Sequence, residues 1–262
     1  MKTTEIATKE LGYIEKSKVA YADNPSVLDY KTKGAGSDNL TKYARDMYAV
    51  TGVNWQGQAW CQTFANWVFW KAYGYDTANK LLCGMIKSAS TMDVKDKFKS
   101  KNQLVPLSDA QEGDLVFRSR NGGGHVGLVI GRSSGGAIIT IEGNSSSEDI
   151  NAWNGGAVVK HIGAYWDWCA RPDYSLIPKY TPKTWYFDSY GGWWYAKDEN
   201  TYAKSEWLDI NHHRYYFNDK GYAVTGYQNI DGGRYYFETS GDLECALMIT
   251  NQADQLTYKY II

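Results

Sequence analysis

The stretch from Trp60 to Gly74, WCQTFANWVFWKAYG, decides the fold of the first part of this chain. Between its end points it contains neither glycine nor proline, and its apolar residues recur at helical spacing. The sequence therefore predicts a buried amphipathic helix over residues 60–73 that ends at Gly74 as its C-cap. Cys61 falls in the first turn of this helix, where unpaired N–H groups and the positive end of the helix dipole favour a thiolate.

A cysteine at this position has two interpretations. In the first it is a buried structural residue, because a free cysteine behaves as a small hydrophobic side chain. In the second it is a nucleophile, and the same N–H groups are available to stabilise an oxyanion on a substrate. The second interpretation requires a base and an orienting group elsewhere in the chain.

A histidine stands at the start of a short apolar run. His125 precedes residues 126–130, VGLVI, which are typical of a strand buried in the core. Residues 113–117 predict the preceding strand, and the glycine-rich segment 118–124 predicts a hairpin between the two. A lone histidine at a strand end is commonly a surface or hydrogen-bonded structural residue, so its meaning depends on what accompanies it.

Two polar residues, Glu142 and Asn144, end the next apolar run, which spans residues 137–141. Residues two apart on a strand point to the same face, so we expect both side chains on one face of a sheet. A thiolate that attacks, an imidazole that moves the proton and a third group that holds the ring are the parts of a cysteine hydrolase. Their occurrence together favours the nucleophile interpretation of Cys61.

Residues 1–175 resemble a CHAP domain, the cysteine-dependent amidohydrolase/peptidase module of phage endolysins and bacterial wall hydrolases. The related NlpC/P60 hydrolases commonly use a second histidine as the orienting group, whereas the Glu-Gly-Asn element here favours CHAP. We interpret His161, the only other histidine of this segment, as structural. The similarity rests on four motifs in the family's order and approximate spacing: Trp60-Cys61-x-x-Phe64, residues 113–117 (GDLVF), residues 124–129 (GHVGLV) and residues 141–144 (IEGN).

The resemblance implies a role for each residue of the set. Cys61 would be the nucleophile, His125 the general base and Glu142 the group that orients His125, with Asn144 as a further polar partner. It also implies an α+β, papain-like fold in which the nucleophile's helix lies against an antiparallel sheet. We expect helices near residues 4–16, 39–50, 60–73 and 88–100, and about five strands between residues 114 and 172.

Neither a metal ion nor a cofactor is expected. Some members of the family bind calcium in an Asp-rich loop before the nucleophile, but residues 53–59, VNWQGQA, contain no carboxylate. The four cysteines show no metal-ligand spacing. A disulfide between Cys83 and Cys169 stays open, although a cytoplasmic origin would argue against it.

The composition changes after about residue 175, where tryptophan and tyrosine become frequent. Residues 214–217, RYYF, recur as residues 234–237, an offset of 234 − 214 = 20 residues, and a glycine follows each copy at the same distance. Aromatic strands and glycine turns at this period predict a solenoid of β-hairpins, each burying its rings on its neighbour. We expect residues 176–183 to be a linker and residues 184–262 to form the repeat domain.

These repeats resemble the choline-binding, or cell-wall-binding type 1, repeats, whose aromatic cages suit a quaternary ammonium ion. Arg214 and Arg234 stand where the family pattern has tryptophan, and an arginine in or beside a cage would repel a choline cation. We therefore expect a cell-wall glycan or teichoic acid as ligand, with choline as the alternative. If the rings do not simply form the core of the solenoid, the best candidates for a ligand face are Trp193, Trp194, Trp207, Tyr215, Tyr227 and Tyr235.

Charge and hydropathy exclude several classes of partner. The net charge of −1 gives no indication of nucleic-acid binding. Residues 1–10, MKTTEIATKE, contain no apolar run, so we expect neither a signal peptide nor membrane insertion. This fits a phage lysin held in the host cytoplasm until a separate membrane lesion gives it access to the wall. A trimmed piece of a secreted enzyme would look the same.

Together these features predict a peptidoglycan hydrolase that cleaves an amide bond and is carried to the cell wall by its repeats. Two bonds fit, and they correspond to an N-acetylmuramoyl-L-alanine amidase or to an endopeptidase of the stem or cross-bridge. The alternatives are a wall-binding protein without catalysis and a cysteine peptidase that acts on a surface protein. The intact set of Cys61, His125, Glu142 and Asn144 argues against the first of these.

Overall fold

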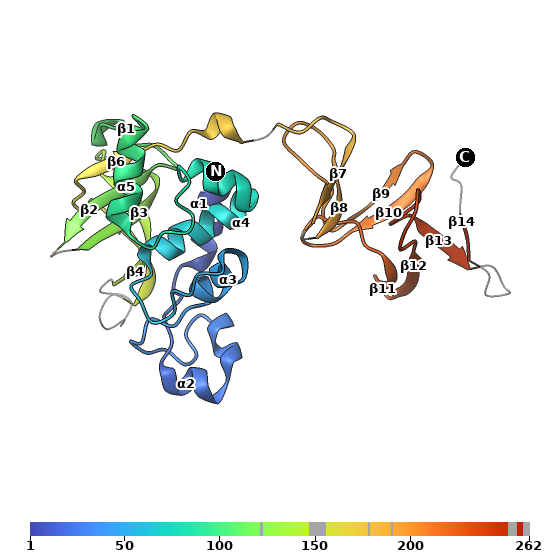
Figure 1. The fold of residues 1–262 in the computed structure, drawn as a ribbon, viewed down its shortest axis with the longest axis horizontal. Coiled ribbons are helices and arrows are strands. Elements are labelled where there is room, and N and C mark those ends of the chain that lie inside the picture. Colours follow the sequence, from blue (N-terminus) through green and yellow to red (C-terminus); the bar gives the residue numbers. More distant parts are fainter. Residues whose placement is uncertain (121–122, 147–155, 178, 190, 251–255, 259–262) are drawn as a thin grey trace. The chain divides into compact units, whose positions relative to one another are not determined.

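The chain divides into two compact units, Met1–Ile177 and Pro178–Ile262 (Figure 1). The computed structural model describes residues 1–120, 123–146, 156–177, 179–189, 191–250 and 256–258. The helices and a six-stranded sheet belong to the first unit, and the described elements of the second unit are all strands. No helix among the described residues is both long and apolar enough to cross a lipid bilayer.

Three of the described α-helices begin at a residue whose side chain caps the helix. Ser17, Thr41 and Ser90 each accept a hydrogen bond from a backbone N–H of the first helical turn, which would otherwise lack a partner. The described α-helices are α1 (Lys2–Glu10), α2 (Lys18–Asp23), α3 (Lys42–Thr51), α4 (Cys61–Leu81) and α5 (Thr91–Ser100). The described 3-10 helices are η1 (Pro25–Asp29), η2 (Leu107–Asp109) and η4 (Tyr174–Leu176).

The first predicted helix, residues 4–16, is too long. α1 ends at Glu10, and the chain then turns at Gly12, whose φ of 82° lies in the left-handed region. The backbone N–H of Gly12 donates to Val158 O at 3.0 Å, and Val158 N–H donates to Tyr13 O at 2.8 Å. These hydrogen bonds to a strand far along the chain explain why the helix stops, because they engage backbone groups that a continued helix would need.

The predicted end of the nucleophile's helix at Gly74 is also only partly correct. Gly74 has the non-helical angles φ 73° and ψ 170°, as expected of a helix end. The chain resumes helical geometry beyond this kink, however, and α4 continues to Leu81. Ala78 and Leu81 are buried, so packing of this second segment against the core explains the continuation.

The predicted antiparallel sheet is confirmed. Its strand order is β1-β6-β2-β3-β4-β5, and all neighbours are antiparallel. Five of these strands fall between residues 114 and 172, as expected, and the short β1 was not predicted. The papain-like assignment stays a prediction. The strands are β1 (Leu104–Val105), β2 (Leu115–Arg120), β3 (Gly123–Arg132), β4 (Ile138–Ser145), β5 (Ala157–Ile162) and β6 (Trp168–Ala170).

The start of α4 lies directly on β4. The helix packs against β3 and β4, while α5 covers β2, β3 and β6 (Figure 1). A Cβ atom on Gly143 of β4 would stand only 2.6 Å from the Cβ of Phe64 and 2.8 Å from the indole of Trp60. The absence of a side chain at Gly143 therefore sets how closely the helix approaches the sheet.

We expect Gly143→Ala to destabilise the first unit by about 1–3 kcal/mol, because the added methyl group overpacks this contact. Urea unfolding followed by the helical circular dichroism signal would report on this unit, which holds the described helices. Gly135→Ala is the matched control, since a Cβ there meets only Ser133 Oγ at 3.9 Å. Equal unfolding free energies for both variants would contradict the role given to Gly143.

The second unit is built from antiparallel hairpins. The turns of two of them, at Asn211-His212 and Asp231-Gly232, have positive φ at both residues, as two-residue type I′ hairpin turns require. The hairpins are β7–β8 (Thr184–Asp188 and Gly192–Ala196), β9–β10 (Glu206–Ile210 and His213–Phe217) and β11–β12 (Gly226–Ile230 and Gly233–Phe237). β13 (Leu247–Thr250) and β14 (Leu256–Tyr258) extend the last sheet.

The sequence repeat corresponds to a repeat of ring contacts. Trp185 of β7 packs on Tyr215 and Phe217 of the next hairpin, with ring centroids 4.8 and 5.7 Å apart. Trp207 of β9 packs in the same way on Tyr235 and Phe237, at 5.0 and 5.8 Å. Burial of rings on the neighbouring hairpin is thus confirmed for these two contacts, while the solenoid architecture stays a prediction.

Candidate active site

Cys61 is the first residue of α4 and is 5% exposed. The preceding Trp60 is fully buried, and its indole Nε1–H donates to Glu15 Oε2 at 2.7 Å. The first hydrogen bond at the helix start runs from Phe64 N–H to Trp60 O at 2.8 Å, so the N–H groups ahead of Phe64 have no intrahelical partner. The thiol therefore stands beside free backbone donors, as the sequence predicts.

The sheet brings His125 and Glu142 to the thiol. They lie on the neighbouring strands β3 and β4, and His125 Nε2 is 2.7 Å from Glu142 Oε2. The Cys61 thiol lies near enough to the imidazole to raise its pKa. Because Nε2 faces the carboxylate, Nδ1 is the ring nitrogen left for sulfur. Three of the four predicted residues thus lie together at one site, and two of them, His125 and Glu142, are hydrogen-bonded.

Asn144 does not join this site in the expected way. Its φ is 52°, and the register between β4 and β5 shifts between Glu142 and Ser145. This β-bulge interrupts the alternation on which the same-face expectation rests. Ser145, three residues beyond Glu142, contacts the carboxylate instead, whereas Asn144 Oδ1 is buried with no hydrogen-bond partner among the described residues.

Glu142 is fully buried, and its two oxygens are hydrogen-bonded by several donors. Thr140 Oγ1 donates to Oε1 at 2.7 Å, and Ser145 Oγ donates to Oε2 at 3.2 Å. Arg118 Nη2 lies 3.8 Å from Oε2. Burial raises the pKa of Glu142, but the hydrogen bonds to His125 and Thr140 outweigh this effect and hold the pKa below its usual value. The carboxylate is therefore ionised.

His125 is held as an imidazolium. Burial lowers its pKa, but the hydrogen bonds to Cys61 and Glu142, together with their negative charges, raise it to about 9. At neutral pH the ring therefore carries a proton on both nitrogens, between the sulfur and the carboxylate. An imidazolium beside a thiol is the arrangement that supports a thiolate nucleophile.

Trp166 lies beside the imidazole and was not predicted from the sequence. Its ring is nearly parallel to that of His125, with an interplanar angle of 9° and centroids 6.1 Å apart. Gly127 makes room for it, since a Cβ there would stand 2.9 Å from the indole. The guanidinium of Arg118 lies 5.0 Å from the same ring. No local pattern marks Trp166, because it lies between β5 and β6 rather than in a strand.

The other three cysteines lack the environment of a nucleophile. Burial raises the pKa of the Cys83 thiol, and burial together with Asp114 raises that of Cys169 to about 12. Burial likewise raises the pKa of Cys245 to about 12. All four cysteines are free, so the disulfide left open between Cys83 and Cys169 is not formed.

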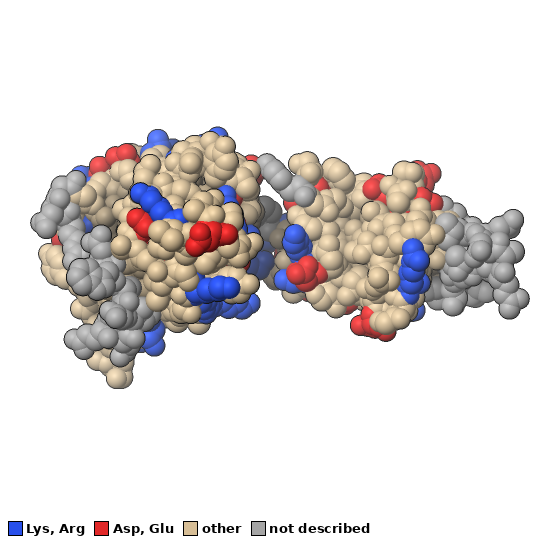
Figure 2. Space-filling model, turned by 90° about the horizontal axis from the view of Figure 1, so that it is seen from below, with Lys and Arg blue, Asp and Glu red and all other residues tan. Residues whose placement is uncertain are grey.

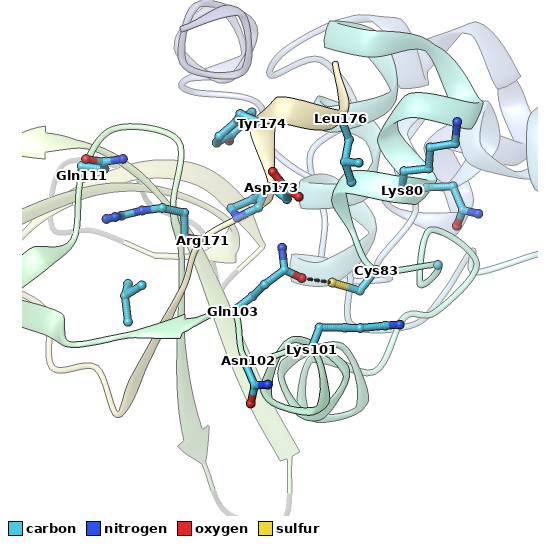
Figure 3. A pocket seen from close by; sticks show the side chains of 14 residues that line it. Lys80, Cys83, Lys101, Asn102, Gln103, Gln111, Arg171, Asp173, Tyr174 and Leu176 are labelled. Atoms are coloured by element: carbon cyan, nitrogen blue, oxygen red, sulfur yellow. Dashed lines mark hydrogen bonds between the residues drawn. The ribbon is translucent and has the colours of Figure 1, made fainter. Parts of the chain in front are cut away.

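A cavity of about 860 Å³ opens on the first unit, away from Cys61 (Figure 3). Cys83 lies within it and donates to Gln103 Oε1 at 2.8 Å, and Arg171 is bound through Nε and Nη2 to Asp114. None of the residues that line this cavity belongs to the group of Cys61, His125 and Glu142. Within the described ranges, no group of three or more His, Cys, Asp or Glu side chains is placed to hold a metal ion.

The predicted ligand-face residues of the second unit differ in accessibility. Tyr227 is 60% exposed, and the guanidinium of Arg234 lies 4.4 Å from its ring centroid. Tyr215 is 7% exposed and belongs to the core, so it is the least accessible of the six. The remaining four, which are partly buried, are Trp193, Trp194, Trp207 and Tyr235.

Aromatic side chains surround Trp194. Tyr186 stacks on it with centroids 4.5 Å apart and an interplanar angle of 13°. Tyr180 and Tyr202 approach its ring edge-on, at 4.9 and 5.9 Å. On the face drawn in Figure 2, most of the surface of the second unit is uncharged, with a few basic and acidic side chains interspersed. The features that this unit offers a ligand are therefore mainly aromatic rings and not charged groups.

Models of known families match the segment around Cys61 and His125 and part of the aromatic second unit. Residues 52–144 match the model of the CHAP domain, and residues 203–244 match that of a choline-binding repeat. The chain therefore contains a CHAP domain followed by a choline-binding repeat. No curated protein matches the chain.

Several solved structures of wall-active proteins are similar to parts of the chain. The modular Cpl-1 endolysin, complexed with a peptidoglycan analogue, is 22% identical over 35% of this chain and 36% of its own, with a TM-score of 0.19. The pneumococcal cell wall endolysin from phage Cp-1, complexed with choline, is 23% identical over 38% and 36%, with a TM-score of 0.19. Choline binding protein F from Streptococcus pneumoniae is 17% identical over 52% and 48%, with a TM-score of 0.20. The chain thus spans about a third of the length of the two endolysins.

We expect Cys61→Ser to lower the pKa of His125 from about 9, because the serine hydroxyl supplies no negative charge to the imidazolium. The imidazolium persists below the folded-state pKa and is lost above it, so the variant should deprotonate at a lower pH than the native protein. Titration of the ¹⁵N resonances of His125 would measure the shift. His212 and His213, in the other unit, serve as internal references; an unchanged His125 titration would mean that the thiol does not support the charge.

Proposed function

We propose that this protein is a peptidoglycan hydrolase that cleaves an amide bond of the bacterial cell wall. The observation that carries the proposal is the grouping of Cys61, at the start of a helix, with the hydrogen-bonded pair His125 and Glu142, inside the segment that matches a CHAP domain. The choline-binding repeat that follows supports a wall substrate.

In the first step the Cys61 thiolate attacks the carbonyl carbon of the scissile amide. The unpaired N–H groups at the start of α4 stabilise the oxyanion that develops on the carbonyl oxygen. The His125 imidazolium then gives its proton to the departing nitrogen. The C–N bond breaks, a free amine leaves, and the acyl group remains on sulfur as a thioester.

In the second step His125 is neutral and acts as a base. It takes a proton from water, and the resulting hydroxide attacks the thioester carbonyl, so that a carboxylic acid is released and the thiolate is restored. Glu142 remains ionised throughout. Its hydrogen bond to Nε2 keeps Nδ1 directed at the sulfur and stabilises the imidazolium whenever it forms.

Two wall amides suit this chemistry: the bond between muramic acid and L-alanine, and a peptide bond of the stem or cross-bridge. Both give a free amine and a carboxylic acid, and they differ only in the groups that flank the carbonyl. The alternative enzyme, a cysteine peptidase acting on a surface protein, would use the same steps on a polypeptide.

The second unit would hold the enzyme on the wall. We propose a cell-wall glycan or teichoic acid as its ligand, because stacked half-buried rings such as Tyr186 and Trp194 suit the flat apolar faces of sugar rings. Choline is the alternative, supported by the match to a choline-binding repeat. The guanidinium of Arg234 argues against it at one position, since it already covers the ring of Tyr227.

Cys61→Ala should reduce clearing of purified Gram-positive sacculi by about 1,000-fold or more, because it removes the nucleophile. Turbidity would follow the reaction, and mass spectrometry of the released fragments would identify the new amine and acid ends. Cys83→Ala is the matched control and should clear walls at the native rate, since Cys83 lies outside the site.

The outcomes separate the three functions. New ends at muramic acid indicate an amidase, and new ends within the peptides indicate an endopeptidase. Walls that bind the native protein but are never cleared would indicate a binding protein without catalysis. Intact walls together with cleavage of a polypeptide would indicate a peptidase of surface proteins.

Arg234→Gln should strengthen choline binding by about tenfold, because it uncovers the Tyr227 ring and removes a repelling charge. Isothermal titration with choline would measure the change. Arg214→Gln is the matched control, because Arg214 is engaged by Asp209 through two hydrogen bonds of 2.7 and 2.9 Å. Equal choline affinities for both variants would show that Arg234 does not oppose choline binding.

A further inference from the structure

The hydrogen-bonded series of the active site does not end at Glu142. Ser145 Oγ lies 3.2 Å from Glu142 Oε2 and, on its other side, 3.2 Å from His161 Nε2. His161 belongs to β5, where it stands opposite Thr140 of β4. A histidine that the sequence marks only as structural is therefore connected to the catalytic imidazole through two intervening side chains.

The direction of these bonds follows from the number of protons available. An ionised carboxylate only accepts, so the single hydroxyl proton of Ser145 is donated to Glu142. The hydroxyl oxygen must then accept from His161, which requires a proton on His161 Nε2. Donation into the hydroxyl oxygen polarises its O–H bond and strengthens the bond to Glu142.

The connection lies where the pairing of β4 with β5 is irregular. The register between β4 and β5 shifts between Glu142 and Ser145, so regular backbone pairing does not fix this part of β4. The bond from Ser145 to His161 joins the two strands across the bulge by side chains. It thereby limits how far the segment that carries Glu142 can move relative to β3 and His125.

We propose that His161, acting through Ser145, is a positioning residue that holds the Glu142 carboxylate against His125. The inference rests on the proposed function for its catalytic meaning, and on the described contacts alone for its structural meaning. The charged and titratable groups that face Glu142 are His125 from β3 and Arg118 from β2, with His161 beyond Ser145. Of these, only His161 reaches the carboxylate through a hydroxyl group.

Two changes should follow when the connection is cut by Ser145→Ala or His161→Phe. The rate of wall clearing should fall by about tenfold, the effect of losing one hydrogen bond to a charged group. The acid limb of the rate against pH should move upward by about one unit, because a carboxylate that loses a donor is protonated at higher pH. His161→Gln, whose amide N–H can still donate to Ser145, should recover most of the native behaviour.

The same variants have a readout that needs no substrate. The Nε2–H proton of His125 is held by Glu142 at 2.7 Å, and its NMR signal should be strongly deshielded in the native protein. It should move upfield or broaden in His161→Phe and Ser145→Ala. Lys160→Gln is the matched control, since Lys160 is the exposed neighbour of His161 on β5.

Unchanged rates, acid limbs and His125 signals in both Ser145→Ala and His161→Phe would overturn the proposal. Equal losses in His161→Phe and His161→Gln, with the His125 signal unaltered, would also overturn it, because the effect would then be structural. If the native protein clears no walls but the His125 signal still responds to His161→Phe, the positioning role stands and the proposed function fails.

Discussion

The close approach of α4 to β4 at Gly143 is the contact on which the rest of the first unit depends. Because Gly143 has no side chain, Phe64 and Trp60 rest on the strand itself. Cys61 follows Trp60 in the chain, and Glu142 precedes Gly143. The contact that closes the core therefore also brings the thiol to the end of the sheet where His125 and its carboxylate lie.

A buried charge is the second constraint. Glu142 is fully removed from solvent, and an unpaired carboxylate there would be strongly destabilising. His125, Thr140 and Ser145 compensate it by hydrogen bonds from three directions along β3 and β4. The same hydrogen bond between His125 and Glu142 favours the protonated imidazole, so one arrangement stabilises the buried carboxylate and, under the proposed function, the thiolate nucleophile. Trp166 lies parallel to the imidazole, with the ring centroids 6.1 Å apart.

The second unit is stabilised by a different principle. Each hairpin is too small to bury its own rings, and stability comes from packing Trp185 and Trp207 on the hairpins that follow them. In such a unit the surface rings can change without loss of the fold. Arg234, whose guanidinium lies over the ring of Tyr227, is a residue of this kind: under the proposed function it would disfavour a cationic ligand while the hairpin is retained.

The sequence by itself determined the features that are local. It predicted the helix that begins at Cys61, the strands that carry His125 and Glu142, and the 20-residue aromatic repeat, because helical spacing, apolar runs and turn glycines act within a few residues. Only the tertiary structure decided where α1 ends, that Ser145 rather than Asn144 contacts Glu142, and that His161 and Trp166 belong to the site. These features depend on backbone pairing and packing between segments far apart in the chain, which no local pattern encodes.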